Sequence, residues 1–272
     1  METFHNGLAN ARRAVRTGDV DQAVLVAHRL WTGYGPYSVH MVNGLRELHK
    51  EITATSPSGE AASTLFEDAA TALAGFGLLR QAEEEWKRCV EVWGRREAAD
   101  PTDHNRFGYV AAIENLAGAF WARERQDRVV DCLDRSIACY DRWGWKGHRA
   151  TAFRELGAVL LCAGRFEAAE QYAIIAEKQH DEVSAETGRT CLDEVKAHVL
   201  HARIAHARGR KFGARQSLNS ARALAARLTP DRSAEIDFLI RSTRDGRKMP
   251  SVTTTFPIVE YGIVAEDLDD RD

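Results

Sequence analysis

A stretch in the last third of the sequence places side chains that could bind a metal ion along one helical face. Glu194 is followed by His198 four residues later and by His201 three residues after that, and Cys191 comes one turn before Glu194. Residues three or four apart are neighbours on a helix surface, and carboxylate, imidazole and thiolate groups are the usual ligands of zinc. One hypothesis is therefore a metal site, or an unrecognised enzyme that uses Glu194, His198 and His201.

The sequence lacks the motifs of the common catalytic and cofactor sites. It has no HExxH zinc motif, no paired cysteines, no P-loop, no GxGxxG dinucleotide motif and no GxSxG nucleophile elbow. Carboxylate pairs are numerous, as expected of charged helical surfaces, and none stands out as a general acid and base. We therefore expect these histidines to lie on the surface or in a ligand-binding groove and not in a metal site. We also favour a protein without cofactor or catalytic activity over an enzyme.

Charge and hydropathy argue against nucleic-acid and membrane partners. The 272-residue chain has a formal net charge of −3, so there is no sequence-wide basic excess to bind phosphates. No apolar run of about 18 residues predicts a membrane span, and residues 1–7 lack the features of a secretory signal. Five cysteines without a CxxC pair indicate reduced, mostly buried thiols in a cytoplasmic protein. The abundance of arginine and alanine is typical of a GC-rich bacterial genome.

Helical periodicity dominates the elements that must position these side chains. Apolar residues recur every three to four positions, and Ala, Leu, Glu and Arg, which favour helices, are abundant. Glycine, proline and aspartate punctuate the pattern. The predicted helices cover residues 2–17, 20–32, 38–53, 60–75, 79–97, 104–124, 127–142, 149–162, 166–184, 189–208, 211–227 and 230–244.

The end of the chain has a different composition. Residues 245–251 resemble a linker, residues 252–264 are β-branched and aromatic, and the last residues are acidic. We predict a helical domain over 1–244 and a linker with an acidic tail over 245–272. The tail is either disordered or a strand-like segment that occupies a groove of this molecule or of a second copy, which would allow self-association.

A short motif recurs where one predicted helix ends and the next begins. A glycine is followed five residues later by an alanine, and Arg125 and Val130 hold the same places in one degenerate unit. Glycine ends a helix where a positive φ is needed, and the small alanine lets the second helix approach the first. The regular pairs are Gly18 and Ala23, Gly77 and Ala82, Gly164 and Ala169, and Gly209 and Ala214.

The unit around Gly164 carries a longer pattern. Phe153 begins a large-x2-Leu-Gly-x2-Leu run that contains Gly157, and Ala169, Ala173 and Ala176 follow the junction. This pattern resembles the tetratricopeptide repeat (TPR) over roughly residues 4–227. The resemblance implies an all-α, right-handed superhelical solenoid of antiparallel helix pairs. The junctions lie 39 to 59 residues apart, longer than the usual repeat of about 34, so we expect long helices and one inserted helix over 38–53.

The resemblance also implies a ligand-binding groove lined by the first helix of each pair. The unit around Phe66 offers Thr64, Glu67 and Thr71. The other groove positions are richer in basic and amide side chains than in acids, which suits an extended acidic peptide. The alternative is that these are ordinary solvated charges. The predicted groove residues of these other units are Arg12, Arg16, Asn115, Arg123, Arg154, Lys196, Arg203 and His206.

Tryptophans recur near the ends of second helices, at Trp31, Trp93 and Trp143. We favour packing at the junctions between helix pairs. Stacking on a ligand by Tyr34, Tyr37, Trp143 or Trp145 is the alternative.

Three functions are compatible with these features. The first is a non-catalytic scaffold or regulatory partner that binds a protein or an extended acidic peptide. The second is a sensor of a small molecule or signalling peptide, and the third is the enzyme considered above. A fold of this kind does not name its ligand.

Overall fold

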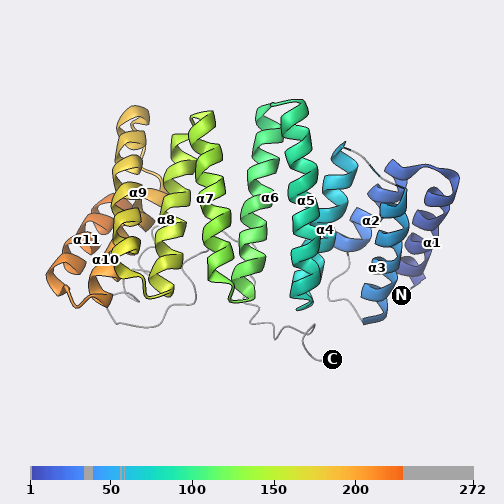
Figure 1. Cartoon of the computed structure of the whole chain (residues 1–272), viewed down its shortest axis with the longest axis horizontal. Coiled ribbons are helices and arrows are strands. Elements are labelled where there is room, and N and C mark those ends of the chain that lie inside the picture. The colour runs from blue at the N-terminus through green and yellow to red at the C-terminus, as the bar shows by residue number, and fades with distance from the viewer. Residues whose placement is uncertain (1, 34–38, 56, 58, 229–272) are drawn as a thin grey trace. The chain divides into compact units, whose positions relative to one another are not determined.

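The computed structural model describes residues 2–33, 39–55, 57 and 59–228, which form eleven helices and no strand. Short turns join successive helices, as Figure 1 shows for α4, α5 and α6. In chain order the helices are α1 (Glu2–Thr17), α2 (Val20–Gly33), α3 (Val39–Ala54), α4 (Gly59–Gly75), α5 (Leu79–Ala99), α6 (Asp103–Ala122), α7 (Gln126–Trp143), α8 (Lys146–Cys162), α9 (Phe166–Thr187), α10 (Leu192–Ala207) and α11 (Lys211–Ala225).

The all-α prediction is confirmed, and each predicted helix within the described residues matches an observed one to within a few residues. The inserted helix is α3, which packs beside α1 and α2 while α2 contacts α4 directly. The predicted helix 230–244 and the predicted tail 245–272 lie outside the described residues. No helix of the described part is long and apolar enough to cross a membrane.

The described helices belong to two compact units. The helical domain over 1–244 stays a prediction. Unit 1 contains α1 to α6 and ends at Glu124, and unit 2 begins at Arg125 and contains α7 to α11. In unit 1, α1 packs on α2 and α4 on α5, and α6 adds to α5. In unit 2, α8 packs on α9 and α10 on α11. These are the antiparallel pairs that the repeat predicts.

The glycine and alanine motif performs the predicted task at four junctions. Gly18, Gly77, Gly164 and Gly209 have φ between 72° and 78°, in the left-handed region that glycine adopts without a Cβ clash. Each helix begins two residues after its glycine. The alanines five residues after these glycines are buried, which confirms that they face the preceding helix.

The degenerate junction was predicted one residue too late. Glu124, not Arg125, has the positive φ, 57°, and α7 begins at Gln126, two residues later. Val129 is fully buried and thus occupies the alanine position, whereas Val130 is half-buried. The error arose because no glycine marks this turn, so the register of the junction could not be fixed from the sequence.

A hydrophobic core holds each unit together. In unit 1, Phe4, Leu30 and Leu45 belong to a buried cluster that joins α1, α2, α3 and α4. In unit 2, Val195, Val199 and Leu218 belong to a cluster between α10 and α11. Trp31 is 4% exposed and belongs to the unit 1 cluster, so its predicted packing role is confirmed.

None of the five cysteines, all of which lie within the described residues, forms a disulfide bond. Cys89, Cys132 and Cys139 are buried as predicted, whereas Cys162 and Cys191 are exposed.

Candidate functional site

A hollow of about 630 Å³ lies in unit 1. Its floor is one face of α4, because Glu67, Thr71 and Gly75 follow one another at helical spacing. Tryptophans of α2 and α5 and an amide of α6 also line it. The described lining residues are Trp31, Thr32, Glu67, Asp68, Thr71, Ala72, Gly75, Phe76, Trp86 and Asn115. We call this hollow the unit 1 pocket.

Three groove positions expected from the repeat meet in the unit 1 pocket. Glu67 and Thr71 come from α4 and Asn115 comes from α6, more than forty residues further along the chain. Thr71 is exposed, and Glu67 and Asn115 are half-buried. Other lining residues escaped the sequence analysis. Trp31 was assigned to packing alone, and Asp68 occupies no groove position of the repeat.

Glu67 hydrogen-bonds to two neutral groups. Its Oε1 accepts from Nε1 of Trp93 at 2.8 Å and from the thiol of Cys89 at 3.6 Å. Burial of Cys89 and the nearby carboxylate of Glu67 raise the pKa of this thiol far above its usual value, so the sulfur stays protonated. These two bonds therefore orient the carboxylate of Glu67 without neutralising its charge.

Asp68 differs from Glu67 because a histidine contacts it. Its Oδ2 lies 2.7 Å from Nδ1 of His28 on α2. Burial raises the pKa of Asp68 to about 6, and the bond from His28 opposes this shift without overcoming it. Asp68 is therefore largely ionised above neutral pH. With Glu67, it gives the pocket two carboxylates, and none of the described residues that line the pocket is lysine or arginine.

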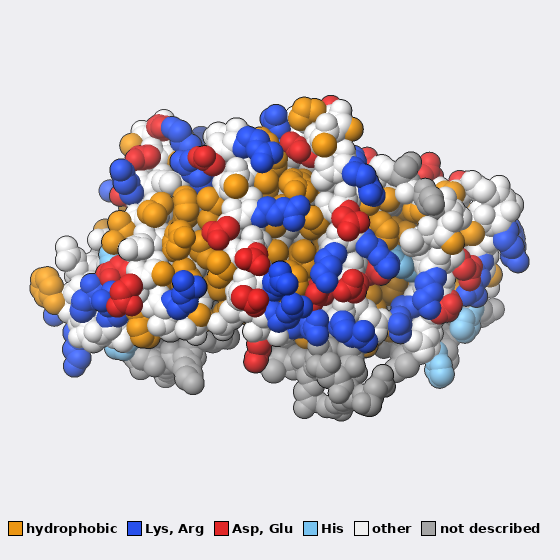
Figure 2. Space-filling model, in the orientation of Figure 1, with side chains coloured by type: hydrophobic (Ala, Val, Ile, Leu, Met, Phe, Trp, Pro, Cys, Tyr) orange, Lys and Arg blue, Asp and Glu red, His pale blue; other side chains and the backbone are white. Residues whose placement is uncertain are grey.

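The predicted basic groove residues of unit 1 lie elsewhere and are largely paired. Nε of Arg12 lies 3.0 Å from Oε1 of Glu51. Nη1 of Arg123 lies 2.7 Å from Oε2 of the buried Glu83. Arg16 is exposed in the last turn of α1. On the face drawn in Figure 2, acidic and basic side chains are interspersed, with hydrophobic side chains between them.

In unit 2, Arg154 is no open groove residue, which corrects the sequence prediction. Its side chain is 1% exposed and forms ion pairs with Glu155 and with Asp193, whose Oδ1 lies 3.1 Å from Nη2. The positive charge of Arg154 is thus balanced by acidic side chains inside the fold, between α8 and α10. Lys196 and Arg203 are half-buried, and His206 is exposed. Burial lowers the pKa of Arg203, and its buried Nη1 has no hydrogen-bond partner in the described part of the chain.

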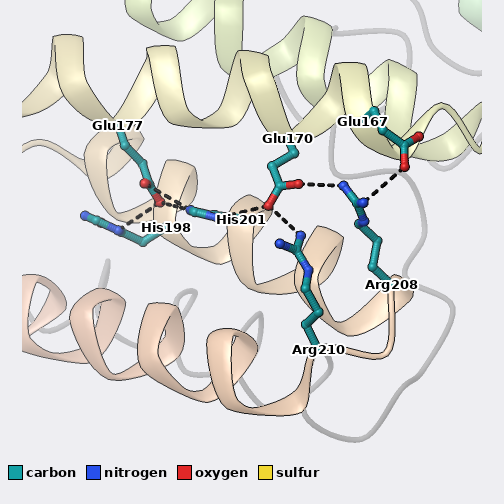
Figure 3. A network of polar contacts seen from close by, with 7 residues as sticks. All are labelled: Glu167, Glu170, Glu177, His198, His201, Arg208 and Arg210. Atoms are coloured by element: carbon teal, nitrogen blue, oxygen red, sulfur yellow. Dashed lines mark hydrogen bonds and ion pairs between the residues drawn. The ribbon is translucent and has the colours of Figure 1, made fainter.

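The predicted metal candidates do not meet at one point. Oε2 of Glu194 accepts from the hydroxyl of Ser184 at 2.6 Å. His198 and His201 instead each place Nδ1 3.0 Å from Oε1 of Glu177 on α9 (Figure 3). Within the described part of the chain, no group of three or more histidine, cysteine or acidic residues is arranged to hold a metal ion. Glu194 therefore contacts a different partner from His198 and His201.

Figure 3 shows what surrounds these histidines instead. Glu170 of α9 forms ion pairs with Arg208 and Arg210, and Nε2 of His201 lies 3.9 Å from Oε1 of Glu170. Alternating charges thus join α9 to the end of α10 and the start of α11. Sequence analysis missed Glu170 and Glu177 because they lie on another helix, more than twenty residues before the histidines that they contact.

Comparisons with known proteins place the fold. No protein-family model and no curated protein matches the sequence. The apo form of RapI matches in structure with a TM-score of 0.58 and 10% identity, over 90% of this chain and 86% of that one. BtubC (BKLC) from P. vanneervenii matches with a TM-score of 0.56 and 14% identity, over 82% of this chain and 91% of that one.

A kinesin light chain with nearly identical TPR-like repeats, from Podosopora anserina, matches with a TM-score of 0.53 and 18% identity. That match covers 82% of this chain and 95% of the other. The chain has a TPR-like helical-repeat fold. At these identities the likeness concerns the fold alone, so the ligand of this TPR-like chain must be argued from its own residues.

Proposed function

We propose that this TPR-like chain is a non-catalytic scaffold that binds a segment of a partner protein in the unit 1 pocket. The observation that carries the proposal is the convergence of Glu67, Thr71 and Asn115 on one hollow with aromatic walls. Buried aromatic surface supplies binding energy, and a few polar groups fix the orientation of the ligand. The structural neighbours support a protein-interaction scaffold of this type.

The acidic-peptide partner expected from the sequence is a proposal for unit 2 only. In unit 1, Arg12 and Arg123 are paired with glutamates, and the pocket itself carries carboxylates. In unit 2, Arg203 and His206 are the basic groove positions best placed for an acidic segment, because Arg154 is buried. A regulatory role in the cytoplasm and self-association through residues 245–272 belong to the same proposal.

Filling the unit 1 pocket tests the scaffold function. Thr71→Trp adds a large side chain at an exposed lining position of α4. Glu91→Trp adds the same side chain at an exposed position of α5 outside the pocket. We expect wild type and Glu91→Trp to retain the same partner from a lysate of the source organism, and Thr71→Trp to lose it. Equal retention by all three proteins would refute the assignment to this pocket.

The size of the pocket favours a sensor of a small molecule as the second candidate. Its volume of about 630 Å³ lies within the usual range for small-ligand sites. A bound small molecule should raise the melting temperature of wild type, since ligand that binds only the folded state stabilises it. The same compound should leave Thr71→Trp unchanged. A retained protein partner favours the scaffold, and a compound-dependent shift favours the sensor.

A further inference from the structure

We propose that the unit 1 pocket takes the cationic side chain of an arginine or lysine from the bound segment of the partner. This inference rests on the proposed scaffold function and names the chemistry that the pocket selects. It differs from the expectation of an acidic ligand, because in unit 1 the fold pairs Arg12 and Arg123 with glutamates.

The first support is negative charge that no lysine or arginine among the described lining residues compensates. Both groups that bond to Glu67, the indole of Trp93 and the thiol of Cys89, are neutral. Among the described residues, the neighbouring carboxyl of Asp68 pairs with the half-exposed His28. A carboxylate that is partly removed from water is costly unless a cation accompanies it. A ligand that brings a positive charge would relieve this cost, whereas an acidic ligand would increase it.

The second support is the aromatic wall. Trp31, Phe76 and Trp86 line the same hollow as the two carboxyls. Aromatic faces, and those of tryptophan most of all, attract ammonium and guanidinium groups. Their apolar area also suits the aliphatic stem of lysine or arginine, which packs along apolar surface while the charged head reaches polar groups. Carboxylates beside aromatic rings therefore match both parts of such a side chain.

The third support is an unfilled hydrogen-bond donor. Trp86 is 3% exposed and lines the pocket, and its Nε1 has no hydrogen-bond partner among the described residues. Buried donors are rarely left unpaired. Together with the amide of Asn115, this N–H could bind a carbonyl of the incoming backbone. An extended peptide supplies carbonyls and a cationic side chain at once.

A neighbouring hollow provides a contrast within unit 1. It has a volume of about 420 Å³ and shares Trp31 with the unit 1 pocket. Arg46, Lys50 and Arg88 line it together with Glu84 and Glu85. Basic side chains here would repel a cation, so the selection that we infer belongs to the pocket that carries Glu67 and Asp68.

An oriented peptide library tests the inference. The probe is a mixture of decapeptides with one central position fixed as Arg, Lys, Gln or Glu and all other positions randomised. Immobilised full-length protein retains peptides, which are then quantified. We expect wild type to enrich Arg and Lys peptides over Gln peptides roughly ten-fold, the size of an ion pair combined with a cation–π contact.

Isosteric variants locate the preference. Glu67→Gln/Asp68→Asn removes both carboxylates and should abolish the enrichment. The control Asp21→Asn/Glu91→Gln also removes two carboxylates, but from exposed positions of unit 1, and should preserve the enrichment. Glu67→Gln alone should reduce the enrichment. This single variant replaces the double variant in the test if the double variant loses its helical circular dichroism signal.

The outcomes separate the two proposals. Retention of no peptide by wild type would overturn the scaffold function and this inference together. Retention without a preference for Arg and Lys would leave the scaffold function standing and overturn the inference. The inference would also fall if the folded carboxylate variants kept the wild-type preference, because the cation would then bind elsewhere.

Discussion

Arg154 contributes to the stability of unit 2 and not to an open groove. Burial alone would lower its pKa, but the charges of Glu155 and Asp193 outweigh that effect and raise it. Arg154→Ala would leave two acids beside an empty site. We expect the free energy of unfolding to fall by about 3–5 kcal/mol, as when one partner of a buried ion pair is removed.

Urea denaturation would measure this loss, with the exposed Arg165→Ala as the control. We expect the control to lie within about 0.5 kcal/mol of wild type. If Arg154→Ala instead kept wild-type stability but lost ligand binding, Arg154 would belong to the binding surface.

Glu177 makes the stability of unit 2 dependent on pH. Burial opposes the charged form of Glu177, but its hydrogen bonds with His198 and His201 outweigh burial and lower its pKa. Burial likewise opposes the charged form of His198, but its hydrogen bond with Glu177 outweighs burial and raises its pKa. For His201, the hydrogen bond that it donates to Glu177 is the largest cause of a raised pKa. The histidines stabilise the fold below their unfolded pKa of about 6.5 and lose this effect as pH rises through their folded pKa values.

The carboxylate contributes with the opposite dependence. Its lowered pKa stabilises the fold above the unfolded value of 4.5 and loses that effect as pH falls. We therefore expect Glu177→Gln to cost about 1–3 kcal/mol near pH 5.5 and clearly less at pH 8.5, the size of hydrogen bonds to charged groups. Thermal melts across this range would measure it, with the exposed Glu182→Gln as the control. An equal cost at every pH would contradict the assignment.

At the scale of the element, a single glycine sets how closely α8 approaches α9. A Cβ on Gly157 would lie 3.2 Å from the backbone oxygen of Ala169 and 3.1 Å from Cδ2 of Leu200. We expect Gly157→Ala to destabilise the protein by about 1–3 kcal/mol, as overpacked cores do.

Gly147 in the same helix is the matched control. A Cβ there would meet nothing within 4 Å, so Gly147→Ala should be neutral or stabilising by up to about 1 kcal/mol, because alanine favours helix. Thermal denaturation of both variants would compare them. A neutral Gly157→Ala would show that the two helices can separate without cost.

The sequence predicted elements well because their signals are local. Glycine at positive φ and a small residue five positions later mark the junctions at Gly77 and Gly164, and the structure places both as predicted. At Glu124 the same turn forms without glycine, so the register was lost by one residue. The partners in the ion pairs could not be predicted, because they are distant in sequence. The glutamates that pair with Arg12 and Arg123 lie 39 and 40 residues away.

At the scale of the whole molecule, the repeat explains why one pocket can be assembled from separate helices. The repeat pattern predicted that Glu67, Thr71 and Asn115 share a groove, but it could not predict the net charge around them. The charge depends on which side chains are neutralised or buried by neighbours. The excess of basic residues among the predicted groove positions therefore did not carry over to the pocket.

Calorimetric titration of the partner segment against wild type, Thr71→Trp and Glu91→Trp would test the central claim most directly. The scaffold account predicts that Thr71→Trp binds at least about ten-fold more weakly than wild type, a loss of about 1.4 kcal/mol, because the added ring occupies the unit 1 pocket. Glu91→Trp should bind as wild type does. Equal affinity of all three proteins would contradict the account, since the ligand would then bind outside this pocket.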